Sequence, residues 1–191
     1  MKLNKAIRNR RTFYPKQFNG NTVPLEVVSE MLELANWAPT HKRTRPWRFM
    51  VYSKKAKDNT LDLFKELYVK HTPSEKFNPH KVEKLEERKK QVSHIIAIVC
   101  DYNPALLPEF EETASTAMAV QNMWLYLAST KKYGGYWSTP NYSLAEEFSS
   151  YLKLDENQKC LGVFYVGEID KDCRDQNGQR EDWKEKVIFY K

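Results

Sequence analysis

Apolar residues recur every three or four positions along several stretches of the chain, a spacing typical of helices with one buried face. This spacing predicts helices over residues 2–11, around 61–68 and over 79–92, and another helix that opens at Pro24. The longest predicted helix covers residues 110–131 and carries apolar residues on more than one face. Such a helix is typical of a central position in the fold or of one half of a subunit interface.

Runs of β-branched and aromatic residues predict strands at three places: residues 47–52, 95–100 and 161–166. Gly134 and Gly135 are expected to end the long helix, and a short strand is expected to begin at Tyr136. Ser143 and Glu146 have the spacing of a capping box, which predicts a helix start there. The chain thus combines helices with about four or five strands, which leaves the α+β and α/β classes open.

Composition indicates a folded protein without a membrane span. Of the 191 residues, 41% are hydrophobic and 13% aromatic, which excludes intrinsic disorder. The longest aliphatic run, residues 95–100, is far shorter than the roughly 20 residues that cross a bilayer. Residues 1–11 lack the apolar segment of a secretory signal, and Cys100, Cys160 and Cys173 form no C-x-x-C pair. We therefore expect a cytoplasmic protein.

Positive charge is concentrated in the first third of the chain. Residues 1–57 contain 13 Lys and Arg against 3 Asp and Glu, whereas residues 58–191 contain 18 against 22. This imbalance favours an anion site in the first third, for either a nucleic-acid backbone or the phosphate of a small cofactor. A solvated surface that is merely basic explains the charge equally well until the motifs are considered.

Several catalytic motifs are missing from the chain. It has no G-x-G-x-x-G, which argues against a Rossmann dinucleotide site, and no G-x-S-x-G nucleophile elbow. Glu168 stands where a P-loop would carry its lysine. The four histidines lack the spacing of metal ligands. We therefore expect neither a metal site nor a hydrolase.

Three segments carry groups suited to an anionic, flat ligand. Residues 9–12 place two guanidinium groups and a hydroxyl at the end of a predicted helix, and guanidinium binds phosphate bidentately. A basic helix end is also favoured by the helix dipole, so this motif alone decides nothing. Residues 38–49 form a cationic loop between prolines that leads into a strand, and residues 135–140 offer backbone N–H groups and two hydroxyls.

In their order and spacing, these motifs resemble the nitroreductase family of flavoenzymes, over nearly the whole chain. The motifs are R-R-T at 10–12, A-P-T-H-x-x-x-x-P-W-R-F at 38–49, Gln121-Asn122 in the long helix, G-G-Y-W at 134–137 and L-G-V-F-Y-V-G at 161–167. The sequence is most similar to the small, single-domain bacterial members of that family.

The resemblance implies one α+β domain over residues 1–191, with a central mixed, mainly antiparallel sheet between two layers of helices. It also implies an intertwined homodimer with one FMN per subunit at the interface. Hydride would pass from NADH or NADPH through FMN to a small electrophile, such as a nitroaromatic or a quinone, by a ping-pong mechanism. No essential acid or base side chain is expected, because the flavin carries the hydride.

The resemblance also implies an FMN site of ten residues: Arg10, Arg11, Thr12, Trp37, His41, Arg45, Trp137, Ser138, Thr139 and Arg180. The first three would hold the phosphate and ribityl chain, and residues 137–139 would line the isoalloxazine. Trp37 and His41 would approach from the partner subunit, and Arg180 would add a phosphate ligand. Arg45 departs from the Asn or Gln common in the family, and a cation there would stabilise the reduced flavin.

Two other functions stay open on the sequence. The basic first third suits a nucleic-acid-binding protein without enzymatic activity. The chain also suits a flavin-binding module whose reductase activity is incidental. We favour the FMN-dependent enzyme, with no nucleic-acid or membrane partner.

Overall fold

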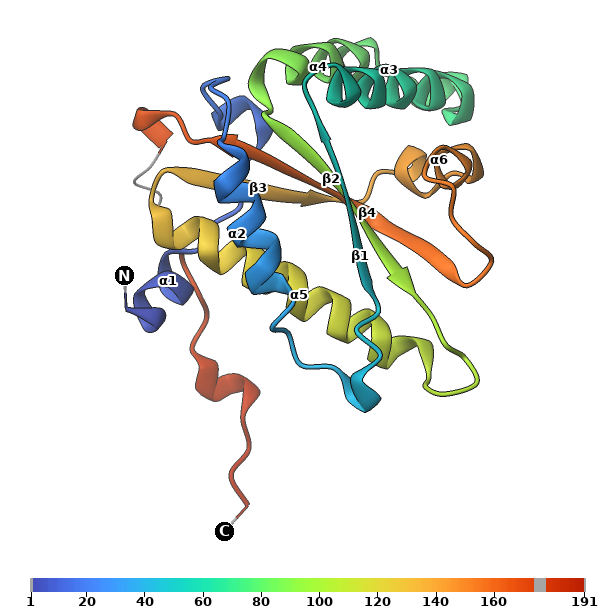
Figure 1. Ribbon diagram of the computed structural model, residues 1–191. Coiled ribbons are helices and arrows are strands. Elements are labelled where there is room, and N and C mark those ends of the chain that lie inside the picture. The colour runs from blue at the N-terminus through green and yellow to red at the C-terminus, as the bar shows by residue number, and fades with distance from the viewer. Residues whose placement is uncertain (1, 174–177, 191) are drawn as a thin grey trace.

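The computed structural model describes residues 2–173 and 178–190, and its centre is one antiparallel sheet (Figure 1). The strands are β1 (Trp47–Ser53), β2 (His94–Asp101), β3 (Tyr133–Ser138) and β4 (Gln158–Glu168). They are arranged in the order β1-β2-β4-β3, and every pair among these described strands is antiparallel. The strands β1 and β3 therefore form the two edges of the sheet.

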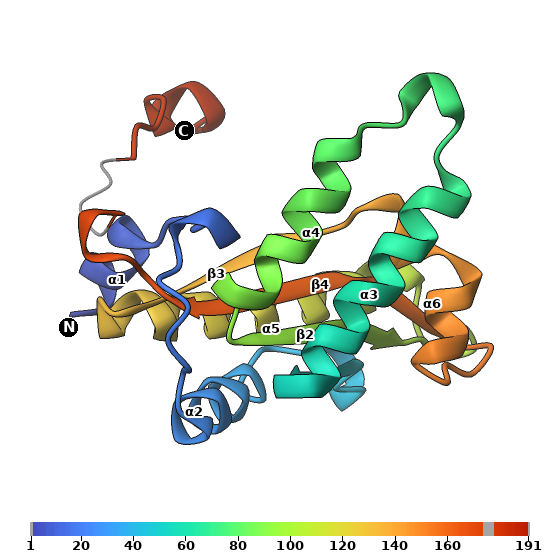
Figure 2. The same ribbon diagram turned by 90° about the horizontal axis from the view of Figure 1, so that it is seen from above.

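Helices cover both faces of this sheet. One face carries α2 (Leu25–Ala35) and α5 (Glu109–Thr130). The opposite face carries α3 (Lys54–His71), α4 (Pro79–Gln91) and α6 (Glu146–Tyr151), as Figures 1 and 2 show. A short helix, α1 (Leu3–Asn9), packs against α5. The predicted α+β architecture of helices, sheet and helices is thereby confirmed.

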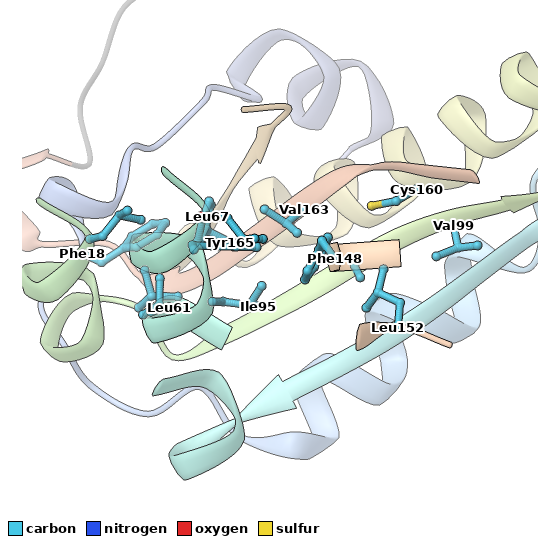
Figure 3. Close-up of a cluster of buried hydrophobic side chains, with 14 of the residues drawn as sticks. Phe18, Leu61, Leu67, Ile95, Val99, Phe148, Leu152, Cys160, Val163 and Tyr165 are labelled. Atoms are coloured by element: carbon cyan, nitrogen blue, oxygen red, sulfur yellow. The ribbon is translucent and has the colours of Figure 1, made fainter. Parts of the chain in front are cut away.

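The two central strands are apolar on both faces because each face is covered. Successive residues of a strand point to opposite sides, so Ile95 and Ile96 enter different cores. Ile95 packs below α3 and α6 together with Phe148 (Figure 3), while Ile96 packs below α5 with Phe164. Each fully buried side chain of this size contributes about 1.5–3 kcal/mol. The sheet is thus a rigid support for the loops and edges around it.

Two predictions about local structure are wrong. Gly134 and Gly135 lie inside β3. The long helix instead ends at Thr130, and its C-cap is Lys131, whose φ is 57°. A Cβ at Gly135 would lie 2.2 Å from the ring of Phe164, so this glycine allows a close approach and is not a helix stop. Ser143 forms no capping box, because its hydroxyl donates to the carbonyl oxygen of Pro140 at 2.8 Å.

The predicted helices and strands otherwise agree with the structure to within a few residues. The first helix is shorter than expected, because the chain turns to an extended conformation at Arg10. The segment 187–190 belongs to no strand and is exposed. No helix of the described residues has the length and apolar content to cross a membrane.

Candidate functional site

Three arginines from distant parts of the sequence gather just beyond α1. The guanidinium carbon of Arg10 lies 4.9 Å from the centre of the Trp124 ring on α5. Burial, followed by the charges of Arg180 and Arg11, lowers the pKa of Arg10. An arginine stays protonated at any physiological pH, so this shift reports a partly buried guanidinium that also lies near two like charges. The structure thus brings Arg180 to the arginine pair from which it is separated by most of the chain.

This arginine cluster, Arg10, Arg11 and Arg180, has no acidic counterpart in the described part of the chain. Arg11 Nη1 donates to the carbonyl oxygens of Arg8 and Arg10, at 2.7 and 2.8 Å. Its Nε is buried and has no hydrogen-bond partner among the described residues. A buried N–H of a guanidinium group that lacks a hydrogen-bond partner is costly. The cluster is therefore suited to an anion with several oxygen acceptors, above all a phosphate.

A glycine at position 178 allows the backbone to pass close to the guanidinium group of Arg11. A Cβ at Gly178 would lie 2.4 Å from the guanidinium carbon of Arg11, so the backbone passes directly over that group. Any side chain at this position would displace Arg11 or lift the segment that carries Arg180. Gly178 and Trp124 are two members of the site that motif reasoning missed. The sequence signals Trp124 only as an aromatic residue within the long helix, and it carries no signal for Gly178.

The strand β3 leads away from the arginine cluster. The carbonyl oxygen of Gly135 accepts hydrogen bonds from the backbone N–H of Phe13 at 3.2 Å and from the indole of Trp124 at 3.1 Å. The half-buried Thr12 therefore lies beside the first half of β3. Ser138 follows Gly135 by three residues, or about 10 Å along a strand. A strip about 10 Å long thus joins the cluster to the end of β3.

The far end of this strip carries the predicted residues 137–139. The indole of Trp137 is half-buried and donates to the carbonyl oxygen of Leu161 at 2.9 Å. Ser138 pairs with Val163 at the end of the strand, and Thr139 is exposed beyond it. Gly162, with a φ of +109°, lies so close that a Cβ there would be 2.7 Å from the Thr139 side chain. The end of β3 is therefore held against β4.

The other three predicted residues, Trp37, His41 and Arg45, lie in the segment between α2 and β1. Trp37 is 76% exposed, and its indole donates to Glu33 Oε1 at 2.6 Å. His41 Nδ1 lies 2.5 Å from Glu111 Oε2 at the start of α5, and both side chains reach solvent. This segment therefore presents an aromatic ring and an imidazole on the surface of the chain.

The backbone of this loop is strained. Lys42, Arg43 and Arg45 have φ values of 48°, 57° and 46°, a left-handed conformation that costs non-glycine residues roughly 1–3 kcal/mol each. Thr40 holds the loop in this shape, because its Oγ1 accepts the backbone N–H of Arg45 at 3.1 Å and lies 3.2 Å from Thr44 Oγ1. Strain of this kind concentrates at functional sites.

Within one chain the predicted residues divide into two groups. The arginine cluster and residues 137–139 lie along β3, whereas the loop with His41 leads into β1 at the opposite edge. Three strand spacings amount to about 14 Å. Along α5, Glu111 beside His41 and Trp124 beside Arg10 are 13 residues apart, which is about 20 Å of helix. Within one chain the two groups are therefore separated by about 14–20 Å.

A family model described as the nitroreductase family matches residues 7–168, which contain all of β1 to β4 and the whole of α5. The chain belongs to the nitroreductase family. Its predicted resemblance is thereby confirmed.

Individual nitroreductases and related proteins are similar over nearly their whole length. The chain is 27% identical over 170 residues to YfhC of Bacillus subtilis (strain 168), a candidate NAD(P)H nitroreductase, with 88% of this chain and 85% of YfhC covered. The nitroreductase-like family protein from Bacillus cereus superimposes with a TM-score of 0.84 at 22% identity, covering 100% and 96% of the two chains. The FMN-dependent nitroreductase NfnB from Mycobacterium smegmatis, in complex with NADPH, superimposes with a TM-score of 0.78 at 17% sequence identity. The superposition covers 98% of this chain and 97% of NfnB. These two structures share the fold of this chain.

Proposed function

We propose that this protein is an FMN-dependent oxidoreductase that passes hydride from NADH or NADPH through FMN to a small electrophile, such as a nitroaromatic or a quinone. The observation that carries the proposal is the arginine cluster, which has cationic groups but no acidic counterpart in the described residues. Family membership supports it. Similarity to YfhC and to NfnB, one named for NAD(P)H and the other for FMN and NADPH, points in the same direction.

The residues of the cluster fit the phosphate of FMN. Arg10 and Arg11 offer guanidinium groups for its oxygens, and the Nε of Arg11, which has no partner among the described residues, is one such donor. Arg180 adds a third positive charge. Thr12 follows the pair and offers its hydroxyl to the ribityl chain. Because a phosphate monoester carries nearly two negative charges, it would relieve the repulsion among these cations.

The strip along β3 fits the remainder of the cofactor. Its length of about 10 Å leads from the phosphate site to Trp137, Ser138 and Thr139, which we assign to the isoalloxazine. FMN supplies the redox chemistry, and the chain binds it, orients it and excludes water from one of its faces. No general acid or base of the chain is required for hydride transfer. One position then serves donor and acceptor in turn, which is a ping-pong mechanism.

We propose that Trp37, His41 and Arg45 complete this site in the partner subunit of a homodimer. Their distance from the arginine cluster within one chain supports this arrangement. The surface of α5 supports it as well, because Phe110, which is 71% exposed, and Met118 lie on an uncovered apolar face. The C-terminal segment also supports a dimer, because Ile188, Phe189 and Tyr190 are exposed apolar or aromatic residues. They lie in a part of the chain that extends away from the sheet (Figure 1).

We further propose that residues 1–191 form one domain. The N-terminal segment is tied to β3 by the hydrogen bond from Phe13 to Gly135. Gly178, near the other end, packs against Arg11. Both ends of the chain therefore contribute to the same site, which a division into independent units would disrupt.

An absorbance spectrum of the freshly purified protein tests the proposal, followed by anaerobic titration with NADH and NADPH. We expect flavin bands at about one FMN per chain, and their bleaching on addition of either donor. Addition of a quinone or a nitroaromatic should restore the bands. A colourless protein that neither takes up FMN nor oxidises either donor would contradict the proposal, and binding of nucleic acid by such a protein would favour the alternative left open by the sequence.

A further inference from the structure

A cavity of about 670 Å³ lies where β2 ends and α5 begins. Its lining includes two carboxylates, Asp101 and Glu112, and two side-chain amides, Asn103 and Asn157. Glu112 precedes Trp124, beside the arginine cluster, by 12 residues of α5, or about 18 Å of helix. Carboxylate and amide oxygens are the groups that bind hard cations such as Ca²⁺. The cavity therefore has the ligand chemistry of a cation site, at a distance from the arginine cluster.

The carboxylate of Glu112 lacks one of the partners that its burial requires. Glu112 is only 1% exposed. Its Oε2 accepts the backbone N–H of Asn103 at 2.7 Å, whereas its Oε1 is buried and has no hydrogen-bond partner among the described residues. A buried carboxylate oxygen without a partner is costly. A cation bound in the cavity would supply that partner.

The spacing of these residues along the chain favours calcium. Asp101, Asn103 and Glu112 stand at the first, third and twelfth places of a stretch that leads into a helix. In the EF-hand loop the same three places carry calcium ligands. Ala105 and Leu106 depart from that loop, which has a further polar ligand and a glycine at these places. The stretch thus offers part of the ligand set of an EF-hand.

The charges around the cavity determine how tightly it can bind a cation. Asp101 Oδ2 already accepts a hydrogen bond from Arg48 Nη2 at 3.0 Å, and Lys42 and Arg43 also belong to the lining. Within the described part of the chain, no three His, Cys, Asp or Glu side chains gather in a group that could hold a metal. The site therefore has two carboxylates and nearby positive charges. We expect a Kd for Ca²⁺ of about 10⁻⁴–10⁻³ M, the weak end of the calcium range.

We propose that Asp101, Asn103 and Glu112 form a binding site for one Ca²⁺ ion at the junction of β2 and α5. The ion pairs with Glu112 Oε1 and holds the loop 102–108 against the start of α5. Ca²⁺ accepts amide and backbone carbonyl oxygens in irregular arrangements, whereas Mg²⁺ demands nearly octahedral geometry. The expectation that the chain has no metal site rests on the spacing of its histidines, and oxygen ligands of this kind leave no such pattern.

Calorimetry and thermal unfolding test the site on the purified full-length protein after removal of divalent ions with EDTA. Titration with CaCl₂ should give about one Ca²⁺ per chain. At about 10 mM CaCl₂ the Tm should rise by about 3–10 °C above that in NaCl of equal ionic strength. Glu112→Gln keeps an acceptor for the N–H of Asn103 but loses the charge. Its affinity for Ca²⁺ should fall at least about tenfold, and its Tm should rise at most about half as much.

Glu109→Gln is the matched control, because it removes a carboxylate from the same end of α5. Both oxygens of Glu109 accept hydrogen bonds from Lys159 Nζ, at 2.8 and 2.7 Å, and Glu109 is not part of the lining. This variant should keep the full affinity for Ca²⁺. Asn103→Ala removes an exposed side chain and retains the backbone N–H that Glu112 accepts. It should bind Ca²⁺ at least about threefold more weakly, which tests the site even if Glu112→Gln does not fold.

Three results would overturn the proposal. If Ca²⁺ gives neither binding heat nor a change in Tm in the wild-type protein, a water molecule or a proton satisfies Glu112 Oε1 instead. If Glu112→Gln and Asn103→Ala keep the full affinity, the ion binds elsewhere. An equal rise in Tm at the same concentration of MgCl₂ would refute the assignment to Ca²⁺. These measurements report metal binding and stability, so their outcome does not depend on the function proposed above.

Discussion

Replacing Arg10 by alanine should separate cofactor binding from stability, because FMN binding depends on this side chain far more strongly than folding does. In the proposed complex the guanidinium makes a charge-assisted contact to phosphate, worth roughly 1.5–3 kcal/mol. Its loss should weaken FMN binding about 10- to 100-fold. The contribution to folding is much smaller, since Arg10 adds one cation–π contact with Trp124, about 0.5–1 kcal/mol, and lies against two like charges.

Removal of Arg10 costs the contact with Trp124 but relieves repulsion from Arg11 and Arg180. The free energy of unfolding of the FMN-free protein should therefore change by less than about 1 kcal/mol. FMN affinity is measured by titrating the apoprotein and following the quenching of flavin fluorescence, and stability by urea unfolding of the same preparation. The combination of strongly weakened binding with nearly unchanged stability is the expected signature of a phosphate ligand.

Arg8→Ala is the control for this experiment. Arg8 is an exposed arginine of the last turn of α1, and its contact with the cluster among the described residues is made by its carbonyl oxygen. Its FMN affinity should stay within about twofold of wild type. The double variant Arg10→Ala/Arg11→Ala gives the decisive result. If that protein binds FMN as tightly as wild type, the arginine cluster does not hold the phosphate.

Three further predictions concern packing, assembly and pH. Gly135→Ala should lower the free energy of unfolding by about 1–3 kcal/mol, because the added Cβ would lie 2.2 Å from the Phe164 ring; an unchanged urea midpoint would refute this. Met118→Glu should turn a dimer that buries more than roughly 2,000 Å² into monomers without FMN, as measured by light scattering with flavin absorbance; a monomer that keeps FMN would show that the site is not shared. Burial, and then the charge of Lys57, lowers the pKa of His94, so the folded state favours the neutral ring. The associated stability is present above the unfolded-state pKa of about 6.5 and is lost as the pH falls through the lower folded pKa. Urea midpoints between pH 7 and 5 should fall less steeply in His94→Gln than in wild type.

Much of the fold was predictable because helices and buried strands leave local periodicities in the sequence. The spacing of apolar residues located α3, α4 and α5, and the β-branched runs located β1 and β2. The errors occurred where a residue serves a distant neighbour. Gly135 has the character of a helix stop in the sequence, but its role is to make room for Phe164, which follows 29 residues later. Local spacing carries no information about such a contact.

The same division holds for the candidate site. The sequence alone identified Arg10, Arg11 and the cationic loop, because adjacent arginines and the excess of positive charge in the first third of the chain are visible in it. Only the tertiary structure shows that Gly178 carries the chain over Arg11 and brings Arg180 to the cluster. The strand order β1-β2-β4-β3 likewise decides that the loop of His41 and the strip along β3 lie at opposite edges. Both facts depend on which segments pair across the sheet, and that pairing is set by burial of the whole apolar surface rather than by any local segment.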